Sequence, residues 1–361
     1  MAYPTDDIPF SLDLKKNPSQ NPVFCEQLLR DLKGKRRVYR GSWNDRAVIV
    51  KLFLHPQTAQ RHWSREKAGV AALKSACVPT PELLFAGKLD DATPTLIFDF
   101  LPDAQTSLQV WNSLTATDQR IEFLRQFVEV IASLHNAGFV QEDLHLENFL
   151  VSDGTIYAID GDAVSNKGQG EALSNAVSSR NLALFFAQLP PKFDALFDDA
   201  VQHYAGLRKI PVKEITDHLA IDLPFVRRRR RHKYVEKCYR SCSEFERSEF
   251  AGKIAIVRRD QSGANLAQFL KDPDAFLAQG QLLKDGNSST VVRVQGDHYD
   301  WVSKRYNIKS FWLWLSHCFR NTRAWTSWGN AHRLRISGIA TPKAIALVEK
   351  RFGPLRSRGY Y

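Results

Sequence analysis

One short segment constrains the fold of this chain more than any other: residues 139–162, with the sequence FVQEDLHLENFLVSDGTIYAIDGD. The residues before it, 121–136 (IEFLRQFVEVIASLHN), place apolar side chains at helical spacing, and Gly138 supplies a typical stop signal for a helix. Within the segment, two apolar runs around an Asp-Gly turn predict two short strands. The pattern therefore predicts three polar residues in loops beside rigid elements: Asp143, Asn148 and Asp160.

This arrangement fits the chemistry of phosphoryl transfer. That reaction needs a cation on the nucleoside triphosphate, magnesium held by carboxylate and amide oxygens, and a carboxylate beside the accepting hydroxyl group. Asp143 and Asn148 are five positions apart, which is the spacing of a kinase catalytic loop, and Asp160 follows the second short strand, where a metal-binding carboxylate belongs. Aspartate and asparagine are also common turn residues, but their placement after a helix and around two strands favours the catalytic interpretation. Asp162 is an alternative metal ligand.

The preceding residues predict a small sheet with one helix. Residues 37–53 (RVYRGSWNDRAVIVKLF) contain two β-branched and aromatic runs around a turn-prone Trp-Asn-Asp sequence, so they predict a hairpin whose second strand ends on Lys51. Residues 63–73 (WSREKAGVAAL) have helical character, and the Pro-Thr-Pro sequence at 79–81 forces an extended exit before the apolar strand 95–101. The predicted order is strand, strand, helix, strand.

The motifs in these two regions resemble those of one family. DLHLEN followed by IDGD resembles the DLHxxN and IDxx motifs of the lipopolysaccharide core heptose/Kdo kinases (WaaP/InaA type) and the aminoglycoside phosphotransferases, within the protein-kinase-like superfamily. Residues 48–51 (VIVK) resemble the ATP-binding strand of that superfamily. Arg65 and Glu66, in a helix that leads to VPTP at 78–81, resemble the helix pattern of lipopolysaccharide kinases. The resemblance implies an α+β, protein-kinase-like bilobal fold, with a β-rich small lobe and a helical large lobe.

The resemblance also implies cofactors and residue roles. ATP and Mg²⁺ are the expected cofactors, and Lys51 would hold the α- and β-phosphates of ATP. Glu66 would orient Lys51, and Asp143 would accept the proton of the acceptor hydroxyl group. The other motif residues would hold magnesium or support the loop: Asn148 and Asp160 as ligands, with His145 and Asp162 in supporting roles.

The chain is strongly basic, with a formal net charge of +11 and a pI near 9.4. This charge favours acidic partners, which are nucleic acid, anionic lipid or a phosphorylated substrate. The five arginines at 227–231 could form a nucleic-acid arm, a membrane-surface patch or a solvated helix end, but they lack regular aromatic interleaving, so no nucleic acid is expected. Residues 311–319 (FWLWLSHCF), flanked by Lys309, Arg320 and Arg323, have the composition of an interfacial membrane anchor and equally of a core segment.

The sequence predicts a cytoplasmic location. Its first residues, MAYPTDD, include two acids and precede no long apolar run, so neither a signal peptide nor a transit peptide is expected. No stretch approaches the roughly twenty apolar residues that a membrane-spanning helix needs. The resemblance implies a substrate at the inner membrane, and the basic charge agrees with peripheral association with its anionic surface.

Four regions are predicted along the chain: a leader at 1–31, a kinase-like domain at 32–221, a basic linker or helical segment at 222–280, and a second, incomplete kinase-like small lobe at 281–361. The last region follows from a repeat, because residues 66–81 and 327–342 have equal length and both end on Thr-Pro. Lys304 precedes the second copy as Lys51 precedes the first, whereas Ser327 stands where the first copy has a glutamate, and no second catalytic loop follows. The region is interpreted as a docking or regulatory piece or as the product of a shortened two-kinase ancestor.

The predicted function is an ATP- and magnesium-dependent kinase that phosphorylates a sugar hydroxyl group, on a heptose or Kdo residue of the lipopolysaccharide inner core. The sugar specificity comes wholly from the resemblance. A pseudokinase or scaffold in envelope biogenesis is one alternative, because no GxGxxG precedes Lys51 and because Gln141 and Glu142 stand where the family has His-Gly or His-Arg. A small-molecule phosphotransferase of the aminoglycoside or choline type is another, although its cationic substrates usually require an acidic pocket.

Overall fold

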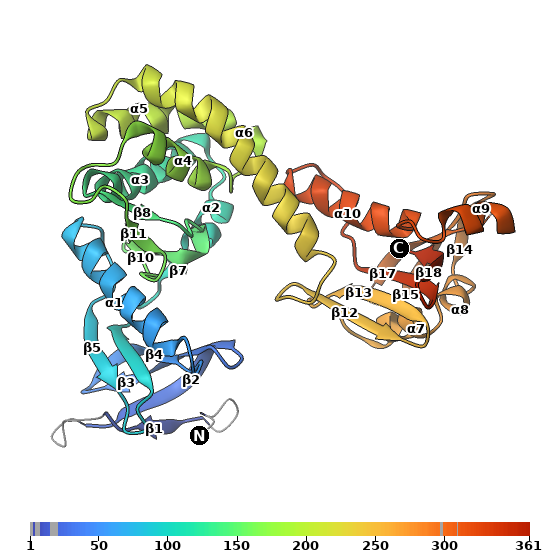
Figure 1. Cartoon of the computed structure of the whole chain (residues 1–361), viewed down its shortest axis with the longest axis horizontal. Helices are drawn as coiled ribbons and strands as arrows, with labels where there is room; N and C mark the ends of the chain where they lie inside the picture. Colours follow the sequence, from blue (N-terminus) through green and yellow to red (C-terminus); the bar gives the residue numbers. More distant parts are fainter. Residues whose placement is uncertain (1–2, 4–7, 15–20, 297–298, 309) are drawn as a thin grey trace. The chain divides into compact units, whose positions relative to one another are not determined.

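A computed structural model describes residues 3, 8–14, 21–296, 299–308 and 310–361 of the chain (Figure 1). The chain is a mixed α and β protein, as the predicted α+β class requires. It divides into two compact units: Met1–Leu189 with Phe193–Val226, and Pro190–Lys192 with Arg227–Tyr361. Lys309, one of the basic flanks of the 311–319 segment, lies outside the described residues, as do parts of the predicted leader.

The first unit begins with a six-stranded antiparallel sheet, in the order β1-β2-β3-β4-β6-β5. Its strands are β1 (Phe10–Leu12), β2 (Val23–Leu32), β3 (Arg36–Trp43), β4 (Arg46–Phe53), β5 (Leu83–Lys88) and β6 (Pro94–Asp99). The predicted hairpin is confirmed as β3 and β4, and Asn44 and Asp45, both left-handed (φ 50° and 59°), form its two-residue turn. The region predicted as a leader contributes β1 and most of β2 instead, because its apolar residues, such as Val23 and Cys25, are buried in the core of the sheet.

One helix covers one face of this sheet. α1 (Ala59–Ser75) follows β4 and packs on β4 and β6 (Figure 1). Side chains alternate between the two faces of a strand, so Val50 and Leu52 of β4 enter the core on the far face, while Phe53 and Lys51 lie on the face that α1 covers. The helix predicted at 63–73 and the strand predicted at 95–101 correspond to α1 and β6.

The rest of the first unit is mainly helical around a core of aromatic side chains. Its helices are α2 (Ser107–Ser113), α3 (Thr117–Asn136), α4 (Asn175–Phe186) and α5 (Phe197–Arg208), with 3-10 turns η1 (Leu146–Asn148) and η2 (Pro191–Leu196). Phe127 of α3 stacks on Phe185 of α4, with ring centroids 4.3 Å apart, and meets Phe149 edge-on at 4.7 Å. Because Phe149 directly follows Asn148, this core also anchors the predicted polar loop.

Short strands frame the polar loop on both sides. β8 (Phe139–Gln141) pairs with β11 (Val164–Asn166), β9 (Phe149–Ser152) pairs with β10 (Thr155–Ala158), and β7 (Gln105–Thr106) adds to β9. The predicted helix stop is confirmed, since α3 ends before Gly138, which is left-handed (φ 81°). The predicted Asp-Gly turn between β9 and β10 is confirmed as well, because Asp153 and Gly154 both have positive φ (46° and 73°).

Helix α6 (Val212–Lys237) continues through the predicted boundary at residue 222. The boundary was expected there because Pro224 and the arginine run change the composition, but the helix includes both of them. A proline removes one main-chain hydrogen bond from a helix, and here the neighbouring Leu219 and Val226 are buried and hold the helix against the core of the first unit. The first unit ends at Val226.

The second unit contains a seven-stranded antiparallel sheet, in the order β12-β13-β17-β18-β16-β15-β14. Its strands are β12 (Phe245–Phe250), β13 (Lys253–Arg258), β14 (Gln281–Gly286), β15 (Ser289–Gly296), β16 (Tyr299–Tyr306), β17 (Ala346–Phe352) and β18 (Leu355–Tyr360). Its helices are α7 (Ala264–Lys271), α8 (Pro273–Leu277), α9 (Phe311–His317) and α10 (Arg323–Ile336). In the part of the chain that the structure describes, no helix is both long enough and apolar enough to cross a membrane.

The two sheets share one pattern of strand pairing. The order β14-β15-β16-β18-β17 repeats the order β2-β3-β4-β6-β5 of the first unit, and α10 follows β16 in the chain as α1 follows β4. Lys304 lies five residues after Tyr299, the first residue of β16, and Lys51 lies five residues after Arg46, the first residue of β4. Each of these strands forms a hairpin with the strand before it. The segment 222–280, predicted as a linker, instead supplies β12, β13, α7 and α8, because residues such as Ile254, Ile256 and Phe269 are buried in the core of this unit.

Candidate functional site

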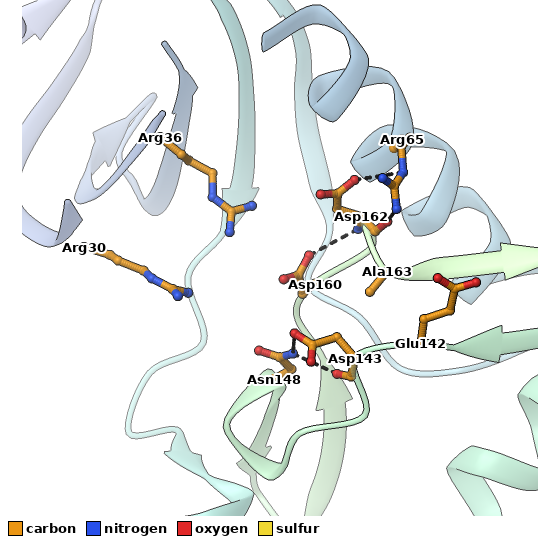
Figure 2. A pocket seen from close by; sticks show the side chains of 9 residues that line it. All are labelled: Arg30, Arg36, Arg65, Glu142, Asp143, Asn148, Asp160, Asp162 and Ala163. Carbon is orange, nitrogen blue, oxygen red and sulfur yellow. Dashed lines mark hydrogen bonds and ion pairs between the residues drawn. The ribbon is translucent and has the colours of Figure 1, made fainter. Parts of the chain in front are cut away.

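The predicted polar residues meet at one pocket of the first unit, with a volume of about 370 Å³. Figure 2 shows the side chains that line it: Arg30, Arg36, Arg65, Glu142, Asp143, Asn148, Asp160, Asp162 and Ala163. They come from β2, β3 and α1 on one side and from the polar loop and the residues after β10 on the other. Four of the seven residues predicted for the site are therefore among its lining residues.

Asp143 and Asn148 contact each other inside the polar loop. The amide nitrogen Nδ2 of Asn148 donates to the main-chain oxygen of Asp143 at 2.9 Å and lies 3.3 Å from its carboxylate Oδ2. Since the amide nitrogen is engaged, the amide oxygen is the atom of Asn148 that can coordinate a cation. His145 lies beside the same carboxylate, with Nε2 3.0 Å from Oδ1 of Asp143, and its main-chain nitrogen donates to the oxygen of Asp143 at 2.8 Å. The predicted bracing position of His145 agrees with these contacts.

Asp160 is held at the pocket by its main chain. Its carbonyl oxygen accepts a hydrogen bond from Nε2 of Gln141 at 2.9 Å, and its carboxylate Oδ1 accepts one from the main-chain nitrogen of Asp162 at 3.2 Å. Gln141 is fully buried at the end of β8. In the sequence, Gln141 was noted only because it differs from the family motif. In the structure its side chain bonds the main chain of Asp160.

A chain of buried polar groups supports Gln141 from behind. Nδ2 of Asn181 donates to the main-chain oxygen of Gln141 at 2.9 Å, and Oδ1 of Asn181 lies 3.0 Å from Nε2 of His135. The other ring nitrogen of His135 lies 2.7 Å from the hydroxyl group of Tyr204. Burial lowers the pKa of His135 to about 4 and raises the pKa of Tyr204 to about 12, so both groups are neutral near pH 7. A neutral ring that donates to Asn181 and accepts from Tyr204 satisfies both of these neighbours of His135.

Lys51 and Glu66 form an ion pair next to this loop. Nζ of Lys51 also donates to the main-chain oxygen of Ile159 at 3.0 Å, directly before Asp160 in the chain. Glu66 has no exposed surface, and its second carboxylate oxygen lies 3.0 Å from Nη1 of Arg36. The predicted pair is therefore present as a buried carboxylate between two cations. Lys51 and Glu66 do not line the pocket themselves, and Arg36 connects them to it.

The carboxylate of Asp162 is paired with side chains of α1, the helix that carries Glu66. Oδ2 of Asp162 lies 2.9 Å from Nδ1 of His62, and Oδ1 lies 3.1 Å from Nε of Arg65, both on α1. Nη2 of Arg65 also donates to the main-chain oxygen of Asp162 at 2.6 Å. These contacts dock α1 against the loop, so Asp162 connects two parts of the site, whereas Asp160 has the carboxylate that faces the pocket (Figure 2).

Arg30 and Arg36 were not predicted as site residues. They flank the β2–β3 turn, where Gly34 is left-handed (φ 68°), and Figure 2 shows both guanidinium groups extending toward the acidic side of the pocket. The signal in the sequence was the basic run at 33–37 (KGKRR), which lies in the strand pair before Lys51. The pocket thus combines guanidinium groups with carboxylate and amide oxygens, which suits an anion together with a divalent cation.

Glu142, next to Asp143, belongs to a separate polar contact at the edge of the pocket. Hydrogen bonds from Lys167 and Ser165 lower the pKa of its carboxyl group, so it stays ionised well below neutral pH. Glu142 therefore adds fixed negative charge beside the polar loop.

A scan against models of known protein families found no match, and a search of curated proteins found none either. The functional interpretation therefore rests on the residues and contacts described above.

Proposed function

We propose that the first unit is an ATP- and magnesium-dependent phosphotransferase with a protein-kinase-like bilobal fold. In this proposal the sheet with α1 is the small lobe, and the helices around α3 form the large lobe. One observation carries it: the ion pair of Lys51 and Glu66 lies against the main chain next to Asp160, while Asp143 and Asn148 line the same pocket as Asp160. These residues come from separate elements, and phosphoryl transfer needs them together.

The residues of the pocket suit magnesium and a triphosphate. Asn148 and Asp160 would hold magnesium, because they offer the amide and carboxylate oxygens that this ion prefers and both line the pocket. Bound magnesium would neutralise charge on the transferred phosphoryl group. Lys51 would bind the phosphates of ATP, and Glu66 would keep the ammonium group of Lys51 in place. Asp143 would accept the proton of the attacking hydroxyl group, with its carboxylate oriented by His145.

The acceptor that we propose is a sugar hydroxyl group, on heptose or Kdo, of the lipopolysaccharide inner core at the cytoplasmic face of the inner membrane. The motif resemblance supports this acceptor, and the net charge of +11 favours an anionic glycolipid and an anionic membrane surface. Exposed aromatic side chains in the second unit support peripheral binding, since Phe311, Trp312 and Phe319 are 63%, 77% and 72% exposed. Exposure on this scale favours the interfacial-anchor interpretation of residues 311–319 over the core interpretation.

The experiment that tests the proposal is transfer of the γ-phosphate from labelled ATP, with magnesium, to purified and dephosphorylated lipopolysaccharide core. We expect transfer by the natural chain and its loss in Asp143→Ala. Binding of ATP without transfer to any acceptor would favour a pseudokinase or scaffold, which the missing GxGxxG motif makes the second candidate. Transfer to an aminoglycoside or to choline, but not to the core glycolipid, would favour a small-molecule phosphotransferase.

A further inference from the structure

Arg36 lies where the pocket meets the buried ion pair of Lys51 and Glu66. Its Nη1 donates to Oε2 of Glu66 at 3.0 Å, and its side chain lines the pocket (Figure 2). The side chains of Glu66 and Lys51 are 0% and 13% exposed, and neither of them lines the pocket. Of the three charged groups in this cluster, Arg36 is therefore the one that a ligand in the pocket can touch.

The cluster has one more cation than Glu66 can neutralise. Lys51 has two further favourable contacts: a hydrogen bond of 3.0 Å to the main-chain oxygen of Ile159, and the ring of Phe98, with Nζ 5.0 Å from its centroid. Within the described residues, the guanidinium group of Arg36 bonds only Glu66, so its Nε and Nη2 can donate to a ligand. If Arg36 turns to an anion, Glu66 still has Lys51 as its counter-ion.

The strand register places a second guanidinium group beside Arg36. Arg30 of β2 stands opposite Val38 of β3, and Val38 stands opposite Lys51 of β4. Side chains alternate along a strand and Arg36 is two residues before Val38, so Arg30, Arg36 and Lys51 lie on one face of the sheet. Diagonal neighbours in an antiparallel pair are about 7–8 Å apart, which long side chains can span. Arg30 also lines the pocket, and its side chain forms no ion pair with any described residue.

Two neighbouring guanidinium groups suit a ligand with linked phosphate groups. Each guanidinium group is a planar fork that can bond two oxygens of one phosphate. The turn between β2 and β3 has a single glycine, Gly34, within the basic run KGKRR at 33–37. It therefore offers charged side chains at the place where a glycine-rich loop would cover the phosphates.

We propose that Arg36 binds the phosphate chain of the nucleotide directly and, together with Arg30, forms a clamp for a ligand with two or more linked phosphates. This inference rests on the function proposed for the first unit and adds a binding residue to it. Arg36 exchanges Glu66 for a phosphate when the ligand binds, and Glu66 then pairs with Lys51 alone. The buried carboxylate keeps a counter-ion in both states.

The test uses the full chain and inorganic tripolyphosphate, without added magnesium. This probe has no adenine and needs no acceptor, so its binding does not depend on catalysis. We expect saturable binding by isothermal titration calorimetry, and about tenfold or greater weakening in Arg36→Ala, because a charge-assisted contact is lost. No saturable binding, or equal affinities of Arg36→Ala and the natural chain, would overturn the proposal.

Arg40→Ala is the matched control for this measurement. Arg40 lies on the same strand as Arg36, but its guanidinium group lies over the ring of Phe100, 4.7 Å from the centroid, and it does not line the pocket. Its loss should change the affinity for tripolyphosphate by less than about twofold, since only a distant, screened charge is removed. A loss in Arg40→Ala as large as in Arg36→Ala would overturn the proposal, because the effect would then be one of net charge.

Arg36→Lys separates the role of Arg36 from its effect on folding. The variant keeps the positive charge beside Glu66 and loses the planar fork, so it should fold like the natural chain by circular dichroism. We expect it to bind tripolyphosphate about threefold or more weakly. If Arg36→Ala fails to fold, this variant decides, and an unchanged affinity would overturn the proposal.

Phosphate transfer from ATP, measured in parallel, distinguishes this inference from the function on which it rests. Binding of tripolyphosphate that depends on Arg36, in a chain that transfers phosphate to no acceptor, would reject the phosphotransferase and support the clamp. Transfer with the same KM for ATP in Arg36→Ala as in the natural chain would reject the clamp and leave the phosphotransferase standing.

Discussion

Gly69 of α1 packs directly against the main chain of Gly161, so that a methyl group on Gly69 would overlap the carbonyl oxygen of Gly161. The contact is reciprocal, because a side chain on Gly161 would lie 2.6 Å from the main-chain oxygen of Glu66 and 2.8 Å from the nitrogen of Val70. Gly161 follows Asp160, and Glu66 pairs with Lys51. Two glycines therefore set the distance between the helix of the ion pair and the loop of the proposed metal ligand.

Replacing Gly69 by alanine should push α1 away from the Asp160 loop. We expect Gly69→Ala to lower the free energy of unfolding of the first unit by about 1–3 kcal/mol, as overpacking does in a close contact. The proposed phosphate transfer should fall as well, because Glu66, which pairs with Lys51, moves away from the Asp160 loop. Gly206→Ala in α5 is the matched control, since a methyl group there meets open space and should raise stability by up to about 1 kcal/mol. Denaturant unfolding of both variants makes the comparison, and equal effects would refute the packing argument.

Glu66 should be essential for the stability of the first unit, apart from the role proposed for it in ATP binding. Its buried carboxylate lies between Lys51 and Arg36, so Glu66→Gln leaves two partly buried cations without their counter-charge. Breaking a buried ion pair from one side typically costs about 3–5 kcal/mol. Asp217→Asn, which removes an exposed pair with Lys213 on α6, should change stability by no more than about 0.5 kcal/mol. Urea unfolding measures both, and a cost for Glu66→Gln as small as the control would contradict the burial argument.

Turns and helix ends near the site could be predicted from the sequence, because each depends on a few neighbouring residues. The β3–β4 hairpin, the end of α3 at Gly138 and the turn at Asp153 each depend on neighbouring residues with a marked conformational preference. These elements present Asp143, Asn148 and Asp160, so the polar loop could be identified without a structure.

Contacts between distant segments could not be predicted in the same way. Gln141 meets Asn181 forty residues away, and Arg36 meets Glu66 thirty residues away, because the sheet and the helices bring their elements together. Pro224 misled the prediction for a related reason: tertiary burial of Val226 outweighs the local cost of a proline inside α6. The strand character of the predicted leader was likewise missed, since β1 and β2 acquire it by pairing with each other and with β3.

Gln141 should govern how tightly the proposed site holds magnesium. Its amide fixes the main chain of Asp160, so Gln141→Ala frees the carbonyl oxygen of Asp160 and loosens the proposed ligand. Removing a group that orients a metal ligand typically lowers metal affinity by about 10–100-fold. We expect the magnesium concentration for half-maximal transfer to rise by a factor of that order. Gln126→Ala, at a half-buried position of α3 where the side chain bonds only Glu122 among the hydrogen bonds described, is the control, and an identical magnesium dependence in both variants would exclude the orienting role.

His135 should make the first unit less stable in mild acid. Its folded-state pKa, lowered by burial to about 4, lies below the ordinary value of 6.5, so the unfolded chain binds the proton more readily. Stability therefore falls as the pH decreases from about 6.5 to about 4, by on the order of 3 kcal/mol in total, and changes no further through this group at lower pH. In the second unit, burial also lowers the pKa of His332 to about 4, so the measurement has to report on the first unit alone. Hydrogen exchange of the main-chain amides of α3 does this, because α3 belongs to the first unit.

The variant His135→Gln separates this contribution from general acid sensitivity. It should be less stable than the natural chain at pH 7, because contacts with Asn181 and Tyr204 are lost. Its stability should depend less steeply on pH between about 4 and 6.5, since no imidazole remains to be protonated. The same slope in the variant and in the natural chain would assign the acid sensitivity to other groups.

Arg30 should contribute to ATP affinity with little effect on the rate of transfer at saturation. It lines the pocket from β2, before the turn at Gly34, where the chain has basic side chains in place of a glycine-rich loop. A guanidinium group on the phosphates binds the ground state and the transition state about equally, so Arg30→Ala should raise KM for ATP about tenfold and leave kcat within about threefold.

Raising the salt concentration should weaken ATP binding by the natural chain more than by Arg30→Ala, because one charge–charge interaction is absent from the variant. Lys88→Ala, which removes an exposed cation from β5 of the same sheet, should leave both constants unchanged. A decrease in kcat with unchanged KM would instead place Arg30 among the groups that act only in the transition state.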